Sequence, residues 1–216
     1  MKASASYTAI AILALACTNA PPAAAPSTGS ISALRALSSG TALERFLPLV
    51  GGHFYEYQFE TDDGKSGILL IKIERPDERH GSWVLPGKGH NAFEYVADGV
   101  LTSGEHGVSY LLQAPLEAGR GWKGGNQSSV EVRRIDATVT VPAGTFEGCV
   151  ETVESRGGDA PLSVTTAYCP KVGMVQRDMS TGTQHERLSL KSFGPPIDLG
   201  PDGTRVLKAE TEATSQ

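Results

Sequence analysis

Two facing stretches, Cys149-Val-Glu-Thr-Val-Glu-Ser-Arg156 and Leu162-Ser-Val-Thr-Thr-Ala-Tyr-Cys169, decide the fold that this sequence predicts. Each alternates β-branched or aromatic residues with polar residues, which is the period-two pattern of a strand with one buried face. Between them lies Gly157-Gly-Asp-Ala-Pro161, a run of residue types that favour turns. The region therefore predicts a β-hairpin centred on Asp159.

The register of this hairpin predicts a disulfide bond. A turn centred on Asp159 places Val150 opposite Tyr168 and Cys149 opposite Cys169. Directly opposed residues of an antiparallel pair have Cα atoms about 4.5 Å apart where they are not hydrogen-bonded, which is at the short end of disulfide geometry. An oxidising compartment would let the bond form. The alternative is two buried free thiols, and a catalytic redox role is not expected because the spacing is not Cys-x-x-Cys.

The same alternating pattern extends outward along most of the chain. No helical period is longer than two turns, and glycine, proline and aspartate separate the alternating segments. We expect an all-β fold, a single antiparallel meander of about ten to eleven strands curved into a half-barrel or closed into a barrel. Thr41 and Glu44 have capping-box spacing, so a short helix is expected near 42–47. The expected strands are 53–60, 68–74, around 83–85, around 93–95, 100–103, 108–112, 130–141, 150–155, 162–168, 174–179 and 184–193.

The strand at 130–141 contains a change of phase. Val130 and Val132 share one face, whereas Ile135, Ala137 and the later valines fall on the opposite parity. A shift of one residue moves every side chain to the other face of a sheet. We therefore expect a β-bulge or a crossing between faces in this strand.

The first residues resemble an export signal. Lys2 supplies positive charge, and the apolar run from Ala9 to Ala16 is far shorter than the roughly 20 residues of a transmembrane helix. Leu13-Ala-Leu-Ala-Cys17 resembles a lipobox, the recognition sequence of lipoprotein signal peptidase. We predict a signal peptide at 1–16 and lipidation of Cys17. The alternative is cleavage at an ordinary Ala-x-Ala site, which leaves Cys17 unmodified.

Composition divides the rest of the chain into three parts. Residues 17–40 are predicted to be the lipid anchor and a disordered tether rich in proline, alanine and serine. The β domain is expected at 41–193, followed by a disordered tail at 194–216. Thr18 stands where many inner-membrane lipoproteins carry aspartate, so we expect an outer-membrane lipoprotein that faces the periplasm. A soluble periplasmic or secreted protein is the alternative.

Charge and motifs argue against several classes of function. The formal net charge is −5 and there is no basic run, so nucleic acid is not an expected partner. None of the five histidines has metal-ligand spacing, and neither a Gly-x-Ser-x-Gly motif nor a P-loop is present. We therefore expect no catalytic, cofactor-binding or metal-binding residues, no cofactor and no enzymatic activity.

The expected role is non-catalytic, either binding or structural. The membrane is the expected partner through the lipid on Cys17, and a protein or small-molecule partner is not identified by the sequence. The alternative function is a carrier for a hydrophobic small molecule held in a concave sheet face. Aromatic side chains would line that face, unless they simply fill the core. These are Tyr55, Tyr57, Trp83, Phe93, Tyr95, Tyr110 and Trp122.

A short motif occurs twice. Pro48-Leu-Val-Gly-Gly-His-Phe-Tyr55 and Pro115-Leu-Glu-Ala-Gly-Arg-Gly-Trp122 share the pattern Pro-Leu-x-x-Gly-x-x-aromatic. Proline ends one element, glycine permits a positive φ, and the aromatic residue enters the core at the start of a strand. The repeat predicts a doubled structural unit, with its glycines serving turns rather than a ligand loop.

With two further motifs, the region 44–192 resembles a family of uncharacterised bacterial exported proteins and lipoproteins. The motifs are Pro48–Tyr55, Leu112–Trp122, Val141-Pro-Ala-Gly-Thr-Phe146 and Tyr168-Cys-Pro-Lys-Val-Gly-Met-Val175. The resemblance implies an exported protein and brings no catalytic residues with it, because that family has no established activity.

Overall fold

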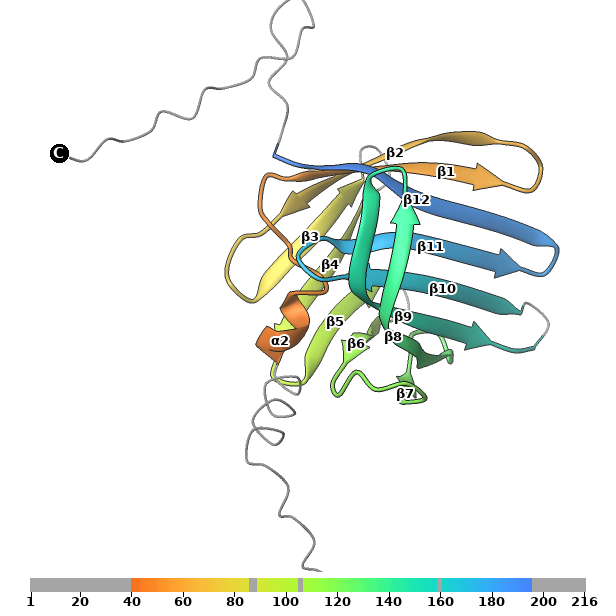
Figure 1. Ribbon diagram of the computed structural model, residues 1–216. Coiled ribbons are helices and arrows are strands. Elements are labelled where there is room, and N and C mark those ends of the chain that lie inside the picture. Colours follow the sequence, from red (N-terminus) through yellow and green to blue (C-terminus); the bar gives the residue numbers. More distant parts are fainter. Residues whose placement is uncertain (1–39, 86–88, 105–106, 159–160, 196–216) are drawn as a thin grey trace, which may run out of the picture.

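A single curved sheet dominates the computed structural model, which describes residues 40–85, 89–104, 107–158 and 161–195. Within these residues, twelve strands form one antiparallel meander that makes a nearly closed barrel (Figure 1). The expected all-β meander is confirmed. The strands are β1 (Phe54–Thr61), β2 (Ser66–Glu74), β3 (His80–Leu85), β4 (Gly89–Val96), β5 (Gly99–Gly104), β6 (Gly107–Gln113), β7 (Gly121–Lys123), β8 (Ser129–Val141), β9 (Gly144–Arg156), β10 (Leu162–Cys169), β11 (Gly173–Thr181) and β12 (Gln184–Gly194).

The structure has one strand more than the eleven expected ranges, because the sequence pattern does not reveal β7. This strand has three residues inside a glycine-rich loop, too few to show an alternating pattern. It forms because Trp122 is buried and pairs with Val130 of β8.

The strand order shows how the barrel is assembled. The order is β6-β5-β4-β3-β2-β1-β12-β11-β10-β9-β8-β7, so two runs of six neighbouring strands meet where β1 pairs with β12. The outermost strands, β6 and β7, approach each other, and the indole Nε1 of Trp122 donates a hydrogen bond of 3.1 Å to the carbonyl oxygen of Tyr110. The two sheet edges are therefore joined by a side chain rather than by a ladder.

The two copies of the repeated motif adopt the same hydrogen-bond pattern. The N–H of Gly52 donates a hydrogen bond to the carbonyl of Ile73. In return, the N–H of Ile73 donates to the carbonyl of His53, the residue after Gly52. In the second copy, Gly119 and the residue after it make the same two bonds with Val132. Both glycines have φ near +80°, which favours glycine (Gly52 82°, Gly119 81°). The two glycines therefore lie in turns, one of which is hydrogen-bonded to β2 and the other to β8.

The chain segment before β1 closes one end of the barrel. Leu43, Phe46, Leu47 and Leu49 are each at most 3% exposed. The phenol of Tyr95 on β4 donates a hydrogen bond to the carbonyl of Leu47 (2.5 Å) and accepts one from the N–H of Leu49 (3.0 Å). Such buried bonds hold the segment against the sheet, because breaking them would leave backbone groups without partners.

The helix in this segment differs from the expected one. The helix α2 spans Gly40–Glu44, not 42–47, and Thr41 lies inside it rather than at its N-cap. A helix of five residues is too short to be stable by its own hydrogen bonds, so packing sets its limits. The chain leaves the helix at Arg45, whose carbonyl accepts a 2.7 Å hydrogen bond from the N–H of Lys171 in the β10–β11 turn.

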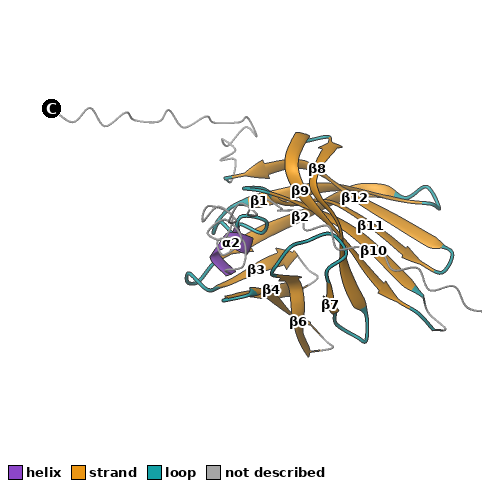
Figure 2. Ribbon diagram, turned by 60° about the horizontal axis from the view of Figure 1, so that its bottom comes forward, coloured by secondary structure: helices purple, strands orange, loops and turns teal. Residues whose placement is uncertain are grey.

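The long strands β8 and β9 bend, and the halves next to the turn that joins them cross β10, β11 and β12 (Figures 1 and 2). The β8–β9 register shifts between Val132 and Val139, and Asp136 takes a positive φ of 59°. The expected bulge is confirmed. The grouping of Ile135 with Ala137 and the later valines was wrong. Ile135 lies at the bend and is 50% exposed, whereas Ala137 and Val139 are buried against the outer face of the sheet.

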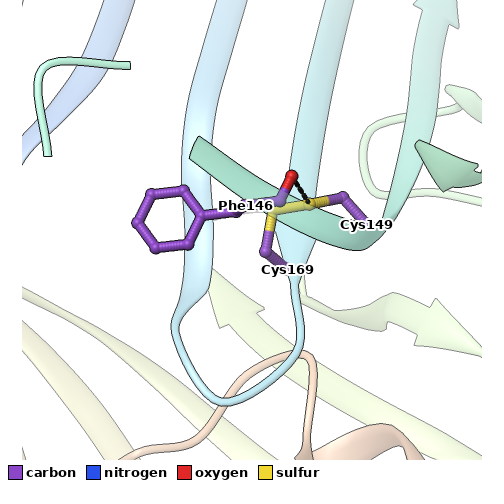
Figure 3. The surroundings of a disulfide bond; sticks show 3 residues. All are labelled: Phe146, Cys149 and Cys169. Carbon is purple, nitrogen blue, oxygen red and sulfur yellow. Dashed lines mark hydrogen bonds between the residues drawn. A yellow bond between two sulfur atoms is a disulfide. The ribbon is translucent and has the colours of Figure 1, made fainter. Parts of the chain in front are cut away.

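The predicted hairpin and disulfide are both present. In β9 and β10, Val150 pairs with Tyr168 and Val153 with Thr165, as a turn centred on Asp159 requires. Cys149 and Cys169 are bonded, with Cα atoms 4.1 Å apart (Figure 3). The carbonyl oxygen of Phe146 lies 3.5 Å from the Cys149 sulfur, a van der Waals contact because a disulfide sulfur carries no proton. The bond fixes the root of the bent hairpin to the end of β10.

Removing the disulfide should destabilise the domain. The bond closes a loop with a sequence separation of 20, which in the chain-entropy model contributes about 3 kcal/mol. We expect wild-type protein with reductant, and a C149A/C169A variant without it, to show lower urea midpoints than oxidised wild type. The double variant is its own control because reductant should leave it unchanged. An oxidised wild type that does not respond to reductant would argue against the bond.

Alkaline pH should unfold the protein through its buried tyrosines. Burial raises the pKa of Tyr55 and of Tyr95 to about 12, and it also raises the pKa of Tyr57 and Tyr168. The neutral phenol is favoured in the folded state, so this stability is complete below about pH 10 and is lost as the pH rises toward the folded-state values. Each tyrosine ionised only in the unfolded state should lower the unfolding free energy by about 1.4 kcal/mol per pH unit.

Urea titrations between pH 8 and pH 12 would measure this slope, and Tyr55→Phe should reduce it by the share of one tyrosine. The Tyr55 phenol also donates a 2.8 Å hydrogen bond to the carbonyl of Val172. The variant should therefore be less stable than wild type at neutral pH and lose less stability at high pH. An unchanged slope would contradict the assignment.

Candidate functional site

The inside of the barrel holds a half-open chamber of about 350 Å³. Strands β9, β10 and β11 form one wall, β5 and β6 form the other, and the β7–β8 turn forms part of the rim. Since β10 runs from the chamber toward the turn held by Arg45, the chamber opens at the end opposite the closing segment. The chamber is the concave site that a carrier would use.

Alternation and register place the wall residues. Even-numbered residues of β9 and β10 face inward, and cross-strand pairing puts them in rows with odd-numbered residues of β11. One row is Thr152–Thr166–Arg177, and the next row toward the mouth is Glu154–Val164–Met179. A third row, at the mouth, begins Arg156–Leu162. All of these residues line the chamber.

The rows divide the chamber into a polar floor and an apolar middle. Thr152 and Thr166, at 4% and 6% exposure, are buried hydroxyl-bearing residues of the floor. Tyr168 belongs to the next row away from the mouth, opposite Val150, and also lines the chamber. Burial raises the pKa of its phenol, so it stays neutral at physiological pH. Apolar side chains surround the space nearer the mouth; they are Leu111, Val130, Leu162, Val164 and Met179, with the ring of Tyr110.

Arg177 is the cation of the floor. It is half-buried on β11, and the polar contact that its guanidinium makes is a 3.9 Å hydrogen bond from Nη2 to the sulfur of Met179. No ion pair among the described residues includes Arg177. A thioether is a weak acceptor, so most of the hydrogen-bonding capacity of the guanidinium remains for another group.

The rim is held by a serine. The Ser128 hydroxyl lies 2.5 Å from Oε1 of Glu154 and 2.7 Å from the carbonyl of Gly125. A Cβ on Gly124 would lie 2.3 Å from that hydroxyl oxygen, so a side chain at this position would displace the Ser128 hydroxyl. Glu154 is the carboxylate of the lining among the described residues, and this bond ties it to the rim.

The aromatic residues expected to line the concave face mostly fill the core instead. Tyr55, Tyr57, Phe93, Tyr95 and Trp122 are each at most 8% exposed and belong to the core, and Trp83 packs edge-on against Phe93. Of the seven candidates, Tyr110 lines the chamber. The interior is therefore filled at the closed end and open at the other.

Sequence reasoning missed the residues that do line the chamber. Arg177, Met179 and Val164 stand in ordinary alternating strands, and nothing in their local pattern separates them from core positions. The pairing of Thr166 with both Thr152 and Arg177 brings them together. The hairpin register did predict the first of these pairs, but not that this face would remain uncovered.

Other hollows lie away from the chamber. They include one of about 640 Å³ along the outer side of β7, β8 and β9, one of about 430 Å³ between the β1–β2 and β11–β12 turns, and one of about 200 Å³ where β8 crosses β10 and β11. Among the described residues, no three His, Cys, Asp or Glu side chains are placed to share a metal ion. No helix in the described ranges has the length and apolar character needed to cross a bilayer.

Several predictions lie outside the described residues. These are the signal peptide at 1–16, the lipid on Cys17, the tether to residue 39 and the tail from residue 196. They remain predictions, as do the outer-membrane location and the domain boundaries.

Comparisons with known proteins find only distant structural similarity. No protein-family model matches the chain, and no curated protein matches its sequence. A Bacteroides fragilis protein described as exported, with a YmcC-like fold, is 15% identical, with 67% of this chain and 96% of that chain covered and a TM-score of 0.46. A Parabacteroides distasonis protein described as a lipoprotein is 12% identical, with 69% of this chain and 98% of that chain covered and a TM-score of 0.43.

The lipoprotein LppX of Mycobacterium tuberculosis is 12% identical over 81% of this chain and 100% of that chain, with a TM-score of 0.34. These structural neighbours are described as exported proteins or lipoproteins. At such identities and TM-scores the likenesses decide nothing about the function of this chain.

Proposed function

We propose that this protein is an exported, lipid-anchored binding protein that takes a small amphipathic molecule into the chamber without catalysing a reaction on it. The observation that carries the proposal is the chamber itself, a volume of about 350 Å³ inside the barrel whose lining is part apolar and part polar, beside a buried hydrophobic core. Small-molecule sites in proteins are typically clefts of about 300–1,000 Å³ with mostly apolar linings and a few polar groups.

The filled end of the barrel supports binding rather than a purely structural role. Residues 43–49 and the aromatic core leave the closed end tightly packed, so the fold has side chains enough to fill its interior there. A protein that needed only stability would gain from closing the remaining space, because unfilled volume costs packing contacts. The chamber walls are held by strand ladders and are therefore formed before a ligand arrives.

The chain enters the domain at the closed end. Residue 40 begins α2, which contacts β4 and β5 there, so the predicted tether joins the domain away from the mouth. This connection supports a domain that stands on a lipid-anchored linker with its mouth accessible.

A neutral, apolar fluorescent probe tests the chamber. We expect N-phenyl-1-naphthylamine to bind wild type with enhanced fluorescence, and V164W to weaken binding at least tenfold because the indole would occupy the chamber. The matched control is V153W, since Val153 lies on β9, next to the β10 strand of Val164, and lines the hollow on the outer side of β7, β8 and β9. If V164W fails to fold, T102W fills the space from the opposite wall. Probe binding that survives both substitutions would exclude the chamber as the site.

The anchor has its own test. Intact-mass spectrometry of the mature protein from a bacterial host should show a chain that begins at Cys17 and carries a diacylglycerol with a further acyl group. C17S should lack these groups and leave the membrane fraction. An unmodified Cys17 thiol beside a free α-amine would instead support ordinary signal-peptidase cleavage.

A further inference from the structure

The floor of the chamber carries the positive charge of Arg177, which forms no ion pair with another described residue. Arg177 extends from β11 between Thr166 of its row and Met179 of the next. The chain as a whole carries a formal charge of −5, so this cation is not part of a generally basic surface. Glu154, in the next row, is hydrogen-bonded to Ser128 at the rim.

A half-buried guanidinium with a thioether as its acceptor is poorly satisfied. Arginine presents five N–H donors in a planar fork that matches the oxygens of a carboxylate or phosphate. Hydrogen bonds to an ionised acceptor are about twice as strong as neutral ones, and they strengthen further away from bulk water. An anion at this position would therefore gain much more from Arg177 than the Met179 sulfur does.

The neighbouring hydroxyls complete an anion site. Thr166 lies directly opposite Arg177, and Thr152 lies opposite Thr166 on the other side. Directly opposed residues on one face of an antiparallel pair have Cβ atoms about 4.5–5.5 Å apart. Thr166 is therefore the direct neighbour of Arg177, and Thr152 lies one strand further away. Tyr168 is held neutral by burial, so it adds no competing negative charge.

We infer that the ligand is a molecule with an apolar chain and one anionic group, and that it enters head first. Arg177 and the threonine hydroxyls bind the anionic group at the floor, and the chain runs past Val164 and Met179 toward the mouth. This orientation follows from the order of the rows: the row of Thr152, Thr166 and Arg177 lies deepest, and Val164 and Met179 lie in the next row toward the mouth. The inference rests on the proposed function and adds the chemical class of the ligand.

Displacement of N-phenyl-1-naphthylamine by three ten-carbon compounds tests the inference: decanoate, decyl phosphate and decanol. In wild type we expect an anionic compound to displace the probe at a concentration at least tenfold lower than decanol. The decanoate and decyl phosphate arms show whether the head group is a carboxylate or a phosphate. In R177Q this preference should disappear while displacement by decanol stays within twofold of wild type.

The matched control is R187Q, which removes the same charge from the neighbouring strand. Arg187 pairs with Asp178 at 2.5 Å and is absent from the chamber lining, so its loss should leave the preference unchanged. A preference for the anions that persists in R177Q, or no preference in wild type, would overturn the inference and leave the proposed function standing. Failure of the probe to bind wild type at all would instead count against the proposed function and remove the basis for a charged ligand.

Discussion

The pairing of β1 with β12 is the constraint on which the rest of the structure depends. It joins the two six-stranded runs of the meander across more than a hundred residues, with Tyr57 opposite Leu190. Without it, each run would be an open sheet with one apolar face in water. With it, the inner faces meet, the aromatic core is buried and a concave interior exists. Because such long-range contacts close large loops, their entropic cost is met only when the whole inner face is buried at once.

Two features protect this closure. At one end, residues 43–49 insert beneath the sheet and use the Tyr95 phenol to satisfy their buried backbone groups. On the outer face, the bent β8–β9 hairpin covers β10 to β12, and the N–H of Ala143 bonds the carbonyl of Leu190 on β12. The disulfide holds the root of that hairpin. Together they leave the interior open at one end, where the chamber lies.

The chamber is a consequence of unequal filling. Large aromatic side chains occupy the closed end, whereas threonine, valine and methionine line the chamber on β9 to β11. The same alternation that buries core residues elsewhere therefore presents small and polar side chains to an open space here. Arg177 gives the floor a positive charge, whereas Val164, Met179 and Leu162 form apolar surface nearer the mouth, where Glu154 and Arg156 also lie.

Much of the fold could be predicted from sequence because strand alternation, turn residues and hairpin register are local properties. They predicted the meander, the bulge before Ala137, and the Cys149–Cys169 bond, since a short turn fixes which residues face each other. The three-residue β7 and the limits of α2 could not be predicted, because packing of Trp122 and of Leu43 decides them.

The sequence by itself determined which residues of each strand share a face. Only the tertiary structure decided which faces are covered. In the sequence, nothing distinguishes Val164 and Arg177 from other alternating strand positions, whereas Tyr57 and Phe93 are candidates for a face that lines a ligand site. The closing segment and the meeting of β1 with β12 assigned the second pair to the core and the first to the chamber. Such an outcome depends on contacts between distant parts of the chain, which a local periodicity does not encode.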